Sequence, residues 1–210
     1  MTEIARLLIT LDDLRPPVRR RIEVPLVHRR DGLHQVIQAA MGWENCHLYE
    51  FRAGGRDGPA YGVPDPDGVF TESDPLPARK ASLADLLAQR TSKARAFTYV
   101  YDFGDDWRHS VKLEAIAAAD PEALYPRLLL AERACPPEDV GGPWGYADYL
   151  EAIANPAHPN HADMIEWRGE GFDPETADEA AIRTRLKRIA TRLGKRGTRA
   201  GGKAGGTTAP

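Results

Sequence analysis

The chain has 210 residues, 42% of them hydrophobic, and a formal net charge of −3. This length is enough for one hydrophobic core, and the sequence holds no run of 18 apolar residues that could span a membrane. Met1–Arg6 lacks the charged and apolar blocks of a secretory signal, and the two cysteines are far apart. We therefore expect a cytoplasmic protein with reduced thiols and no membrane partner.

Apolar periodicity predicts the elements of the N-terminal half. They are strands over Ile4–Leu11, Val18–Val24 and His47–Phe51, and helices over 32–41 and Leu83–Leu87. The Gly- and Pro-rich stretch Arg52–Ala81 is predicted to be a long loop. Within it Asp65–Gly68 faintly resembles a calcium-binding loop, but the full ligand set is missing.

Tyr101–His109 is predicted to be the tight connection of a β-hairpin. Apolar and polar residues alternate over Phe97–Phe103 before it and over 107–114 after it, as in half-buried strands. Asp105 and Asp106 are expected to bond backbone amides in the turn, whereas Asp102 falls on the face opposite the aromatic residues. This stretch holds more carboxylate, imidazole and aromatic side chains than a turn requires.

The C-terminal half combines an irregular segment with helices. Ala134–Tyr146 is too rich in proline and glycine for regular structure, so a loop with a specified path is predicted. Around it we expect an edge segment over Tyr125–Leu130 and helices over Tyr146–Asn155, His158–Trp167 and Pro174–Leu193. The whole pattern predicts a single α+β domain with a mostly antiparallel sheet, packed by an N-terminal helix and by C-terminal helices.

Basic residues concentrate at the C-terminus. Residues 180–210 contain nine Lys and Arg and no acidic residue, so a net charge of −12 remains for the other 179 residues. The folded domain is predicted to cover 1–193, and 194–210 to form a disordered basic tail. The tail is either a solubilising segment or an arm for weak, salt-sensitive nucleic-acid binding. The residues proposed for such binding are Arg188, Arg192, Lys195, Arg196 and Arg199.

Four sequence blocks resemble the plasmid pRiA4b ORF-3 family, over roughly residues 4–190. They are Leu14–Arg20, Leu33–Trp43, Tyr101–His109 and Cys135–Tyr146. The resemblance implies an α+β fold and an association with plasmids and other mobile elements. Some relatives carry transposon-resolvase labels, but nothing here resembles the nucleophile region of a serine recombinase. The resemblance implies no reaction, and no catalytic residue is carried over from it.

One cleft is expected if the Cys135–Tyr146 loop folds over the hairpin turn. Its candidate residues are Asp102, Asp105, Asp106, Trp107, His109, Cys135, Glu138, Asp139 and Trp144. Glu138 and Asp139 are expected to anchor the loop, either to Arg108 or to free backbone donors.

Each of these residues also has a structural interpretation. His109 and His47 lie on apolar strand faces, where hydrogen-bonded core histidines are common, and Cys135 suits a small buried position. Strand alternation puts His47 and Glu50 on opposite faces, which weakens that pair as joint metal ligands. Trp107 and Trp144 are suited either to packing in an aromatic core or to stacking on a nucleic-acid base.

Two functional hypotheses follow. The first is a non-enzymatic binding or accessory module without a cofactor, acting on a protein or nucleic-acid partner. The alternative is a small metal- or cysteine-dependent hydrolase with a cleft around Asp105, His109 and Cys135. Neither an H-E-x-x-H nor a C-x-x-C motif is present, so the sequence does not decide whether a metal is bound.

Overall fold

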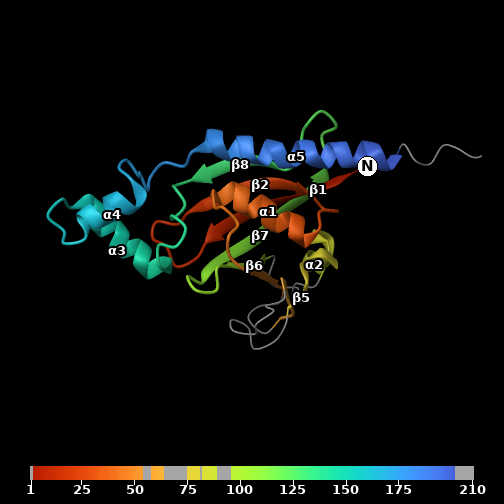
Figure 1. Cartoon of the computed structure of the whole chain (residues 1–210). Coiled ribbons are helices and arrows are strands. Elements are labelled where there is room, and N and C mark those ends of the chain that lie inside the picture. The colour runs from red at the N-terminus through yellow and green to blue at the C-terminus, as the bar shows by residue number, and fades with distance from the viewer. Residues whose placement is uncertain (1, 54–57, 64–74, 81, 89–95, 202–210) are drawn as a thin grey trace, which may run out of the picture.

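An eight-stranded sheet forms the centre of the molecule (Figure 1). The computed structural model describes residues 2–53, 58–63, 75–80, 82–88 and 96–201, and the side chains of these residues except 30 and 195–201. The strands are β1 (Glu3–Leu11), β2 (Arg19–Pro25), β3 (Tyr49–Arg52), β4 (Ala60–Gly62), β5 (Leu76–Pro77), β6 (Ala96–Tyr101), β7 (Trp107–Ala118) and β8 (Arg127–Glu132).

Neighbouring strands in this sheet are antiparallel with one exception. Their order is β5-β4-β3-β6-β7-β1-β2-β8, and only β4 and β5 pair in parallel. The β6–β7 pair is the predicted hairpin, with Tyr101 opposite Trp107 at its closed end. The predicted α+β class with a mostly antiparallel sheet is confirmed.

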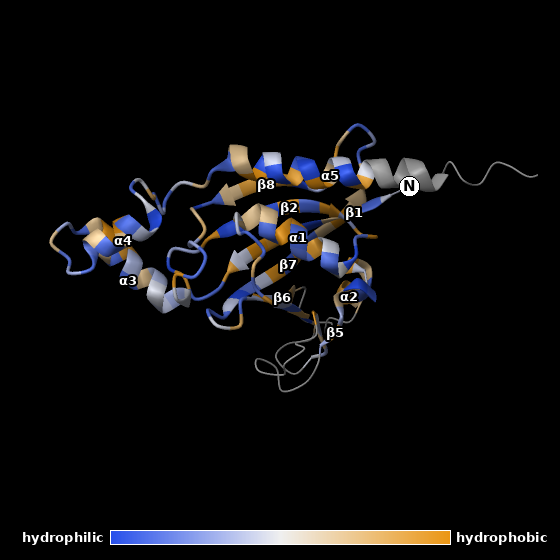
Figure 2. Ribbon diagram, viewed as in Figure 1, coloured by the Kyte–Doolittle hydropathy of each residue, from blue (hydrophilic) through white to orange (hydrophobic). Residues whose placement is uncertain are grey.

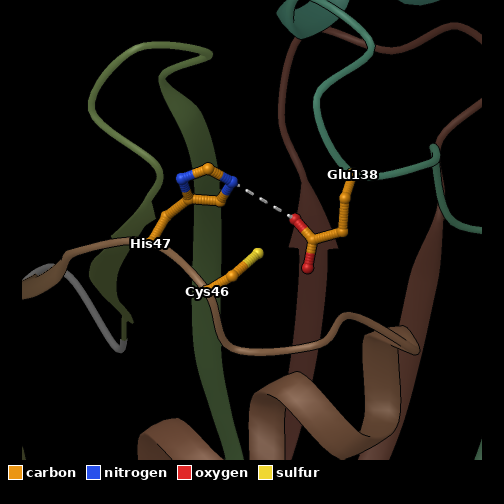
Figure 3. A group of neighbouring side chains, drawn as sticks. All are labelled: Cys46, His47 and Glu138. Carbon is orange, nitrogen blue, oxygen red and sulfur yellow. Dashed lines mark ion pairs between the residues drawn. The ribbon is translucent and has the colours of Figure 1, made fainter.

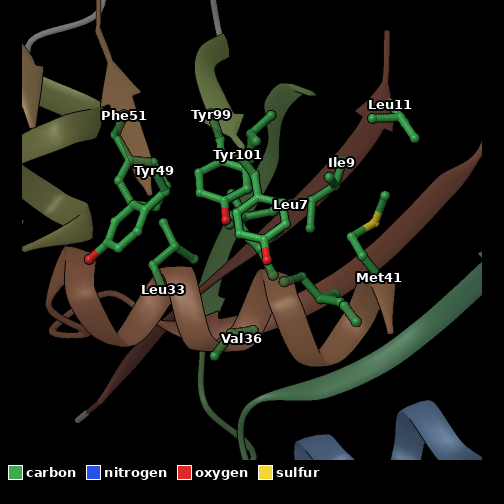
Figure 4. Close-up of a cluster of buried hydrophobic side chains, with 14 of the residues drawn as sticks. Leu7, Ile9, Leu11, Leu33, Val36, Met41, Tyr49, Phe51, Tyr99 and Tyr101 are labelled. Atoms are coloured by element: carbon green, nitrogen blue, oxygen red, sulfur yellow. The ribbon is translucent and has the colours of Figure 1, made fainter. Parts of the chain in front are cut away.

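Helix α1 (Arg30–Met41) covers one face of the sheet (Figure 1). Its apolar stripe, which includes Leu33 and Val36, packs on strand side chains that all point to the same face. Figure 4 shows this layer, in which β1 contributes aliphatic residues and β3 and β6 contribute aromatic ones. The strand residues labelled there are Leu7, Ile9, Leu11, Tyr49, Phe51, Tyr99 and Tyr101. The core therefore lies between α1 and the sheet.

The other helices surround this core. α5 (Glu179–Gly201) lies beside α1 and along β8 (Figure 1), and hydrophobic positions alternate with hydrophilic ones along its ribbon (Figure 2). Its residues Ile182, Leu186 and Ala190 are buried. α3 (Gly142–Ala154) and α4 (His161–Arg168) pack on each other and project beyond one end of the sheet (Figure 1). The short helices η1 (Ala78–Lys80) and α2 (Leu83–Ala88) lie near α1 and β6.

The arginines of β2 are all engaged by other groups of the protein. Arg21 forms an ion pair with Glu114 at 2.7 Å and Arg19 one with Glu132 at 3.3 Å. Arg20 points to the opposite face, where it is 1% exposed and donates a 2.8 Å hydrogen bond to the carbonyl oxygen of Ala40 at the end of α1. These arginines hold strands and helix together and are not a free cationic surface.

Several element boundaries differ from the prediction. β4, β5 and η1 lie inside the stretch predicted to be loop. β4 and β5 were missed because backbone pairing with neighbouring strands is a tertiary effect. The suggested calcium loop at Asp65–Gly68 lies outside the described residues. α5 is helical to Gly201, so the disorder predicted from Gly194 does not apply to 194–201, while 202–210 lie outside the described residues. Among the described residues no helix has the length and apolarity needed to cross a membrane.

Candidate functional site

The proline- and glycine-rich segment noted over Ala134–Tyr146, called here the proline–glycine loop, lies against the hairpin turn between β6 and β7. The backbone N–H of Gly141 donates a hydrogen bond to Oδ2 of Asp105 at 3.1 Å. Next to it, a Cβ added to Gly142 would lie 2.5 Å from the carbonyl oxygen of Asp105. A side chain does not fit in this space, so glycine permits the close approach. The expected contact between the loop and the turn is confirmed.

Glu138 anchors the same loop to the body of the protein. Its Oε1 accepts hydrogen bonds from the backbone N–H of Glu44 at 2.7 Å and from the hydroxyl of Tyr101 at 3.1 Å. Of the two anchors expected, the backbone donor is present, whereas Arg108 instead forms an ion pair with Asp106 at 2.8 Å. The loop is therefore attached to both the turn after α1 and the end of β6.

Asp102 organises the hairpin turn. It has a positive φ of 58°, and its Oδ1 accepts hydrogen bonds from the backbone N–H groups of Gly104 (2.9 Å) and Asp105 (3.3 Å). The prediction gave amide bonding to Asp105 and Asp106; Asp105 does accept a backbone amide, that of Gly141, but the amides within the turn are bound by Asp102 and not by Asp106. Since the regular strand ends at Tyr101, strand alternation no longer determines which way Asp102 points.

His47 is the histidine of this region that faces carboxylates. Its Nε2 lies 2.9 Å from Oδ1 of Asp139, 3.5 Å from Oδ2 of Asp102 and 4.0 Å from Oε2 of Glu138. Cys46 is its chain neighbour, and the Cys46, His47 and Glu138 side chains point toward one another (Figure 3). These residues come from three segments: the turn after α1, the hairpin, and the proline–glycine loop.

This cluster differs from the one predicted. His47 precedes β3, which begins at Tyr49, so the strand argument that placed it in the core does not apply. Cys46 and Tyr101 were not among the predicted site residues. The only signal in the sequence is that a cysteine and a histidine are adjacent in a short connection, which is too common a pattern to be informative.

His109 and Trp107 belong to the hydrophobic core. Both are 0% exposed, and Nδ1 of His109 lies 3.1 Å and 3.2 Å from the carbonyl oxygens of Trp107 and Tyr99. Burial lowers the pKa of His109 to about 3, so the imidazole is neutral at physiological pH. The Trp43 ring packs edge-on against His109 with 5.3 Å between centroids. Neither residue lines the proposed cleft.

Cys135 and Trp144 are not among the residues that surround Nε2 of His47, although Glu138 lines the same cleft as Cys135. Cys135 is partly buried and lines a cleft of about 760 Å³ between the proline–glycine loop and the start of α5. Burial raises the pKa of its thiol to about 12, which keeps it protonated and weakly nucleophilic. Trp144, in the first turn of α3, is 85% exposed. The nine predicted residues therefore do not form one cleft.

A second polar surface lies on α5. Its buried stripe consists of Ile182, Leu186 and Ala190. The side chains of Arg185, Lys187, Arg188 and Arg192 are exposed, and none of them forms an ion pair with another residue in the described part of the chain. We call these four residues the α5 basic face. The backbone of Lys195, Arg196 and Arg199 is helical, but their side chains are outside the described part.

Comparison with known proteins places the chain in a family. Residues 3–181 match the model of the plasmid pRiA4b ORF-3-like proteins. The uncharacterized protein y4hQ of Sinorhizobium fredii (strain NBRC 101917 / NGR234) is 43% identical over 201 residues, covering 95% of this chain and 98% of y4hQ. The crystal structure of MM3350, a protein of unknown function from Methanosarcina mazei Go1, has a TM-score of 0.72 and 35% identity. The match covers 86% of this chain and 97% of MM3350. On this evidence the chain belongs to the plasmid pRiA4b ORF-3-like family.

Proposed function

We propose that the protein is a non-enzymatic binding module that contacts the phosphate backbone of nucleic acid through α5. The supporting observation is the α5 basic face, four exposed cations without an ion-pair partner in the described part of the chain. Lysine and arginine side chains that approach phosphates release condensed counterions, and this release drives sequence-independent binding. The cations of β2 lack this freedom because other protein groups already neutralise them.

The spacing of the basic residues supports an extended contact. Arg185, Arg188 and Arg192 are three and four residues apart, so they lie along one side of the helix. The basic sequence continues through Arg199, and at about 1.5 Å per residue this stretch is about 21 Å long. Such a length spans several phosphates of one nucleic-acid strand.

The chemistry of the predicted nucleophile and base argues against the hydrolase alternative. His109 is fully buried, so a substrate cannot reach it, and its low pKa keeps the imidazole neutral. The Cys135 thiol is held in its protonated form. The carboxylate of Asp105 accepts a structural hydrogen bond from the backbone N–H of Gly141. A binding role requires none of these groups to be reactive.

Fluorescence anisotropy with labelled 20-nucleotide single- and double-stranded DNA, at 50 mM and 200 mM salt, tests this proposal. The double variant Arg188→Gln/Arg192→Gln removes two charges from the α5 basic face. We expect weaker binding to all sequences and a salt slope reduced by about 2, since each phosphate contact contributes about 1. Deleting residues 195–210 is expected to weaken binding further.

The matched control is Arg79→Gln/Lys80→Gln, which removes the same charge from two exposed residues of η1. Its affinity is expected to equal that of the natural protein. The proposal is wrong if no DNA binding occurs at 50 mM salt, or if both double variants lose affinity equally. The second result would indicate a general charge effect and not a contact through α5.

A further inference from the structure

The His47 cluster has the spacing of a metal-binding site. Nε2 of His47 lies 2.9 Å to 4.0 Å from carboxylate oxygens of Asp102, Glu138 and Asp139. The ligand atoms of Cys46, His47 and Glu138 also lie within 4.8 Å of one another. In a tetrahedral zinc site with bonds of about 2.0 Å, neighbouring ligand atoms are about 3.3 Å apart.

The cluster has an excess of negative charge. Asp102, Glu138 and Asp139 converge here, and in the described part of the chain none of them forms an ion pair with lysine or arginine. Asp102 is only 7% exposed and the side chain of Glu138 is 13% exposed, whereas that of Asp139 is 67% exposed. A neutral or singly charged imidazole does not balance three carboxylates in a partly buried site. A bound divalent cation would compensate this charge.

Two of the carboxylates are already oriented. Glu138 uses Oε1 for the backbone of Glu44 and the hydroxyl of Tyr101, while its buried Oε2 has no hydrogen-bond partner in the described structure and faces His47. Asp102 uses Oδ1 for turn amides and directs Oδ2 toward His47. Outer hydrogen bonds of this kind hold metal ligands in place in known sites.

The imidazole nitrogen is also unsatisfied. Nε2 of His47 is buried and, despite the 2.9 Å approach of Asp139, it makes no hydrogen bond of acceptable geometry in the described structure. A buried imidazole nitrogen that faces carboxylate oxygens without a directed hydrogen bond has a lone pair suited to coordinate a cation. This observation is independent of the charge count, and it points to the same position.

We propose that His47, Asp102, Glu138 and Asp139 bind one divalent first-row transition-metal ion, with Zn²⁺ preferred. The Cys46 sulfur either adds to these ligands or replaces one of the carboxylates. Imidazole and thiolate favour zinc over magnesium or calcium. The ion joins the turn after α1, the hairpin and the proline–glycine loop, so it fixes the loop that leads into α3. This inference does not depend on nucleic-acid binding.

Isothermal titration of Zn²⁺ into the tag-free, chelator-treated full chain tests the site. We expect saturable binding of one ion per chain and a rise in melting temperature on zinc addition. His47→Gln and Asp102→Asn are expected to weaken zinc binding by more than about tenfold and to abolish the rise in melting temperature. Asp106→Asn is the matched control, because this carboxylate lies in the same turn but pairs with Arg108.

Two further measurements examine the surroundings of the ion. Tyr101→Phe removes one hydrogen bond to Glu138 and keeps the buried ring, so zinc binding is expected to weaken about tenfold with folding retained. Cobalt substitution reports the geometry by its visible spectrum, and Cys46→Ser removes any thiolate-to-cobalt band. Circular dichroism of each variant shows that it is folded.

The proposal fails if the folded protein binds no zinc saturably at micromolar concentrations. It also fails if His47→Gln and Asp102→Asn bind zinc as tightly as the natural chain, because the ion then occupies another position. Neither result affects the DNA-binding experiment, so the two proposals are tested separately.

Discussion

The carboxylate of Asp105 accepts a hydrogen bond from the backbone N–H of Gly141 at 3.1 Å, across 36 positions of sequence. This contact joins the tip of the β6–β7 hairpin to the residue that precedes α3. Two irregular segments thereby hold one another, although neither has regular secondary structure of its own. The position of the α3–α4 pair relative to the sheet depends on this junction.

Gly142→Ala is predicted to destabilise the junction strongly. Gly142 has a φ of 67°, and a Cβ here would lie 2.5 Å from the carbonyl oxygen of Asp105. Backbone strain and overpacking together are expected to cost about 2–5 kcal/mol in the free energy of unfolding, measured by urea denaturation. Gly171→Ala is the control, because its φ is 88° and nothing lies within 4 Å. Equal losses in the two variants would contradict the close approach at Gly142.

Arg20→Lys is predicted to destabilise the protein although the charge is kept. Besides its bond to Ala40, Arg20 donates hydrogen bonds to the carbonyl oxygens of Arg19 and Glu132, both at 2.8 Å. The three acceptors are reached by two different nitrogens, Nε and Nη1, and the single nitrogen of a lysine cannot occupy both positions, so we expect a loss of about 2–4 kcal/mol in the free energy of unfolding. Arg19→Lys, at a surface ion pair, is expected to cost less than about 1 kcal/mol. Comparable losses from both substitutions would show that Arg20 is not held as described.

Stability is predicted to fall as the pH drops below 6.5. Burial lowers the pKa of His34 to about 4 and that of His109 to about 3, from the ordinary 6.5, and it lowers that of His28 too. The unfolded chain therefore binds protons in a range where the folded chain does not. Each fully buried histidine then removes up to about 1.4 kcal/mol per pH unit between pH 6.5 and its folded pKa.

Urea denaturation at pH 7, 6 and 5 measures this dependence. Burial raises the pKa of Glu138, so this residue makes stability change with pH in the opposite direction. The slope due to one histidine is therefore obtained as the difference between the natural chain and a variant that lacks it. In the variant His34→Gln, the slope of the free energy of unfolding against pH is expected to be smaller by the contribution of about one proton. If its pH dependence matches that of the natural chain, His34 is not buried in its neutral form.

Trp144→Ala is predicted to leave the stability unchanged within about 0.5 kcal/mol, because the side chain is 85% exposed. Trp43→Ala is the contrasting variant: its ring is 6% exposed and its Nε1 donates a hydrogen bond to the carbonyl oxygen of Pro136 at 3.0 Å. We expect this change to cost about 3–5 kcal/mol. A large loss at Trp144 in thermal or urea unfolding would mean that its side chain packs against another part of the protein.

Local pattern determined much of the fold. Alternating apolar residues in β1, β6 and β7, and the apolar stripe of α1, predicted the central elements and the face that each buries. This succeeds because burial of one face imposes a period of two on a strand and of about 3.6 on a helix. β4 and β5 were not predicted, since their backbone pairing leaves little trace in such short segments.

The candidate site shows where local pattern stops being informative. Glu138 and Asp139 were predicted near the hairpin because the proline–glycine loop had to follow a specified path, and they are found there. His109 was grouped with them by its nearness in sequence to the turn, but strand alternation carries its side chain into the core. His47 faces the carboxylates because the chain turns before β3 begins.

The sequence by itself determined the α+β class, the central hairpin and the separation of an acidic body from a basic C-terminal helix. Only the tertiary structure decided which histidine meets the carboxylates and which arginines remain unpaired. The reason is physical: hydrophobic burial acts through periodicity along the chain, whereas a polar cluster depends on atomic distances between segments up to 94 residues apart.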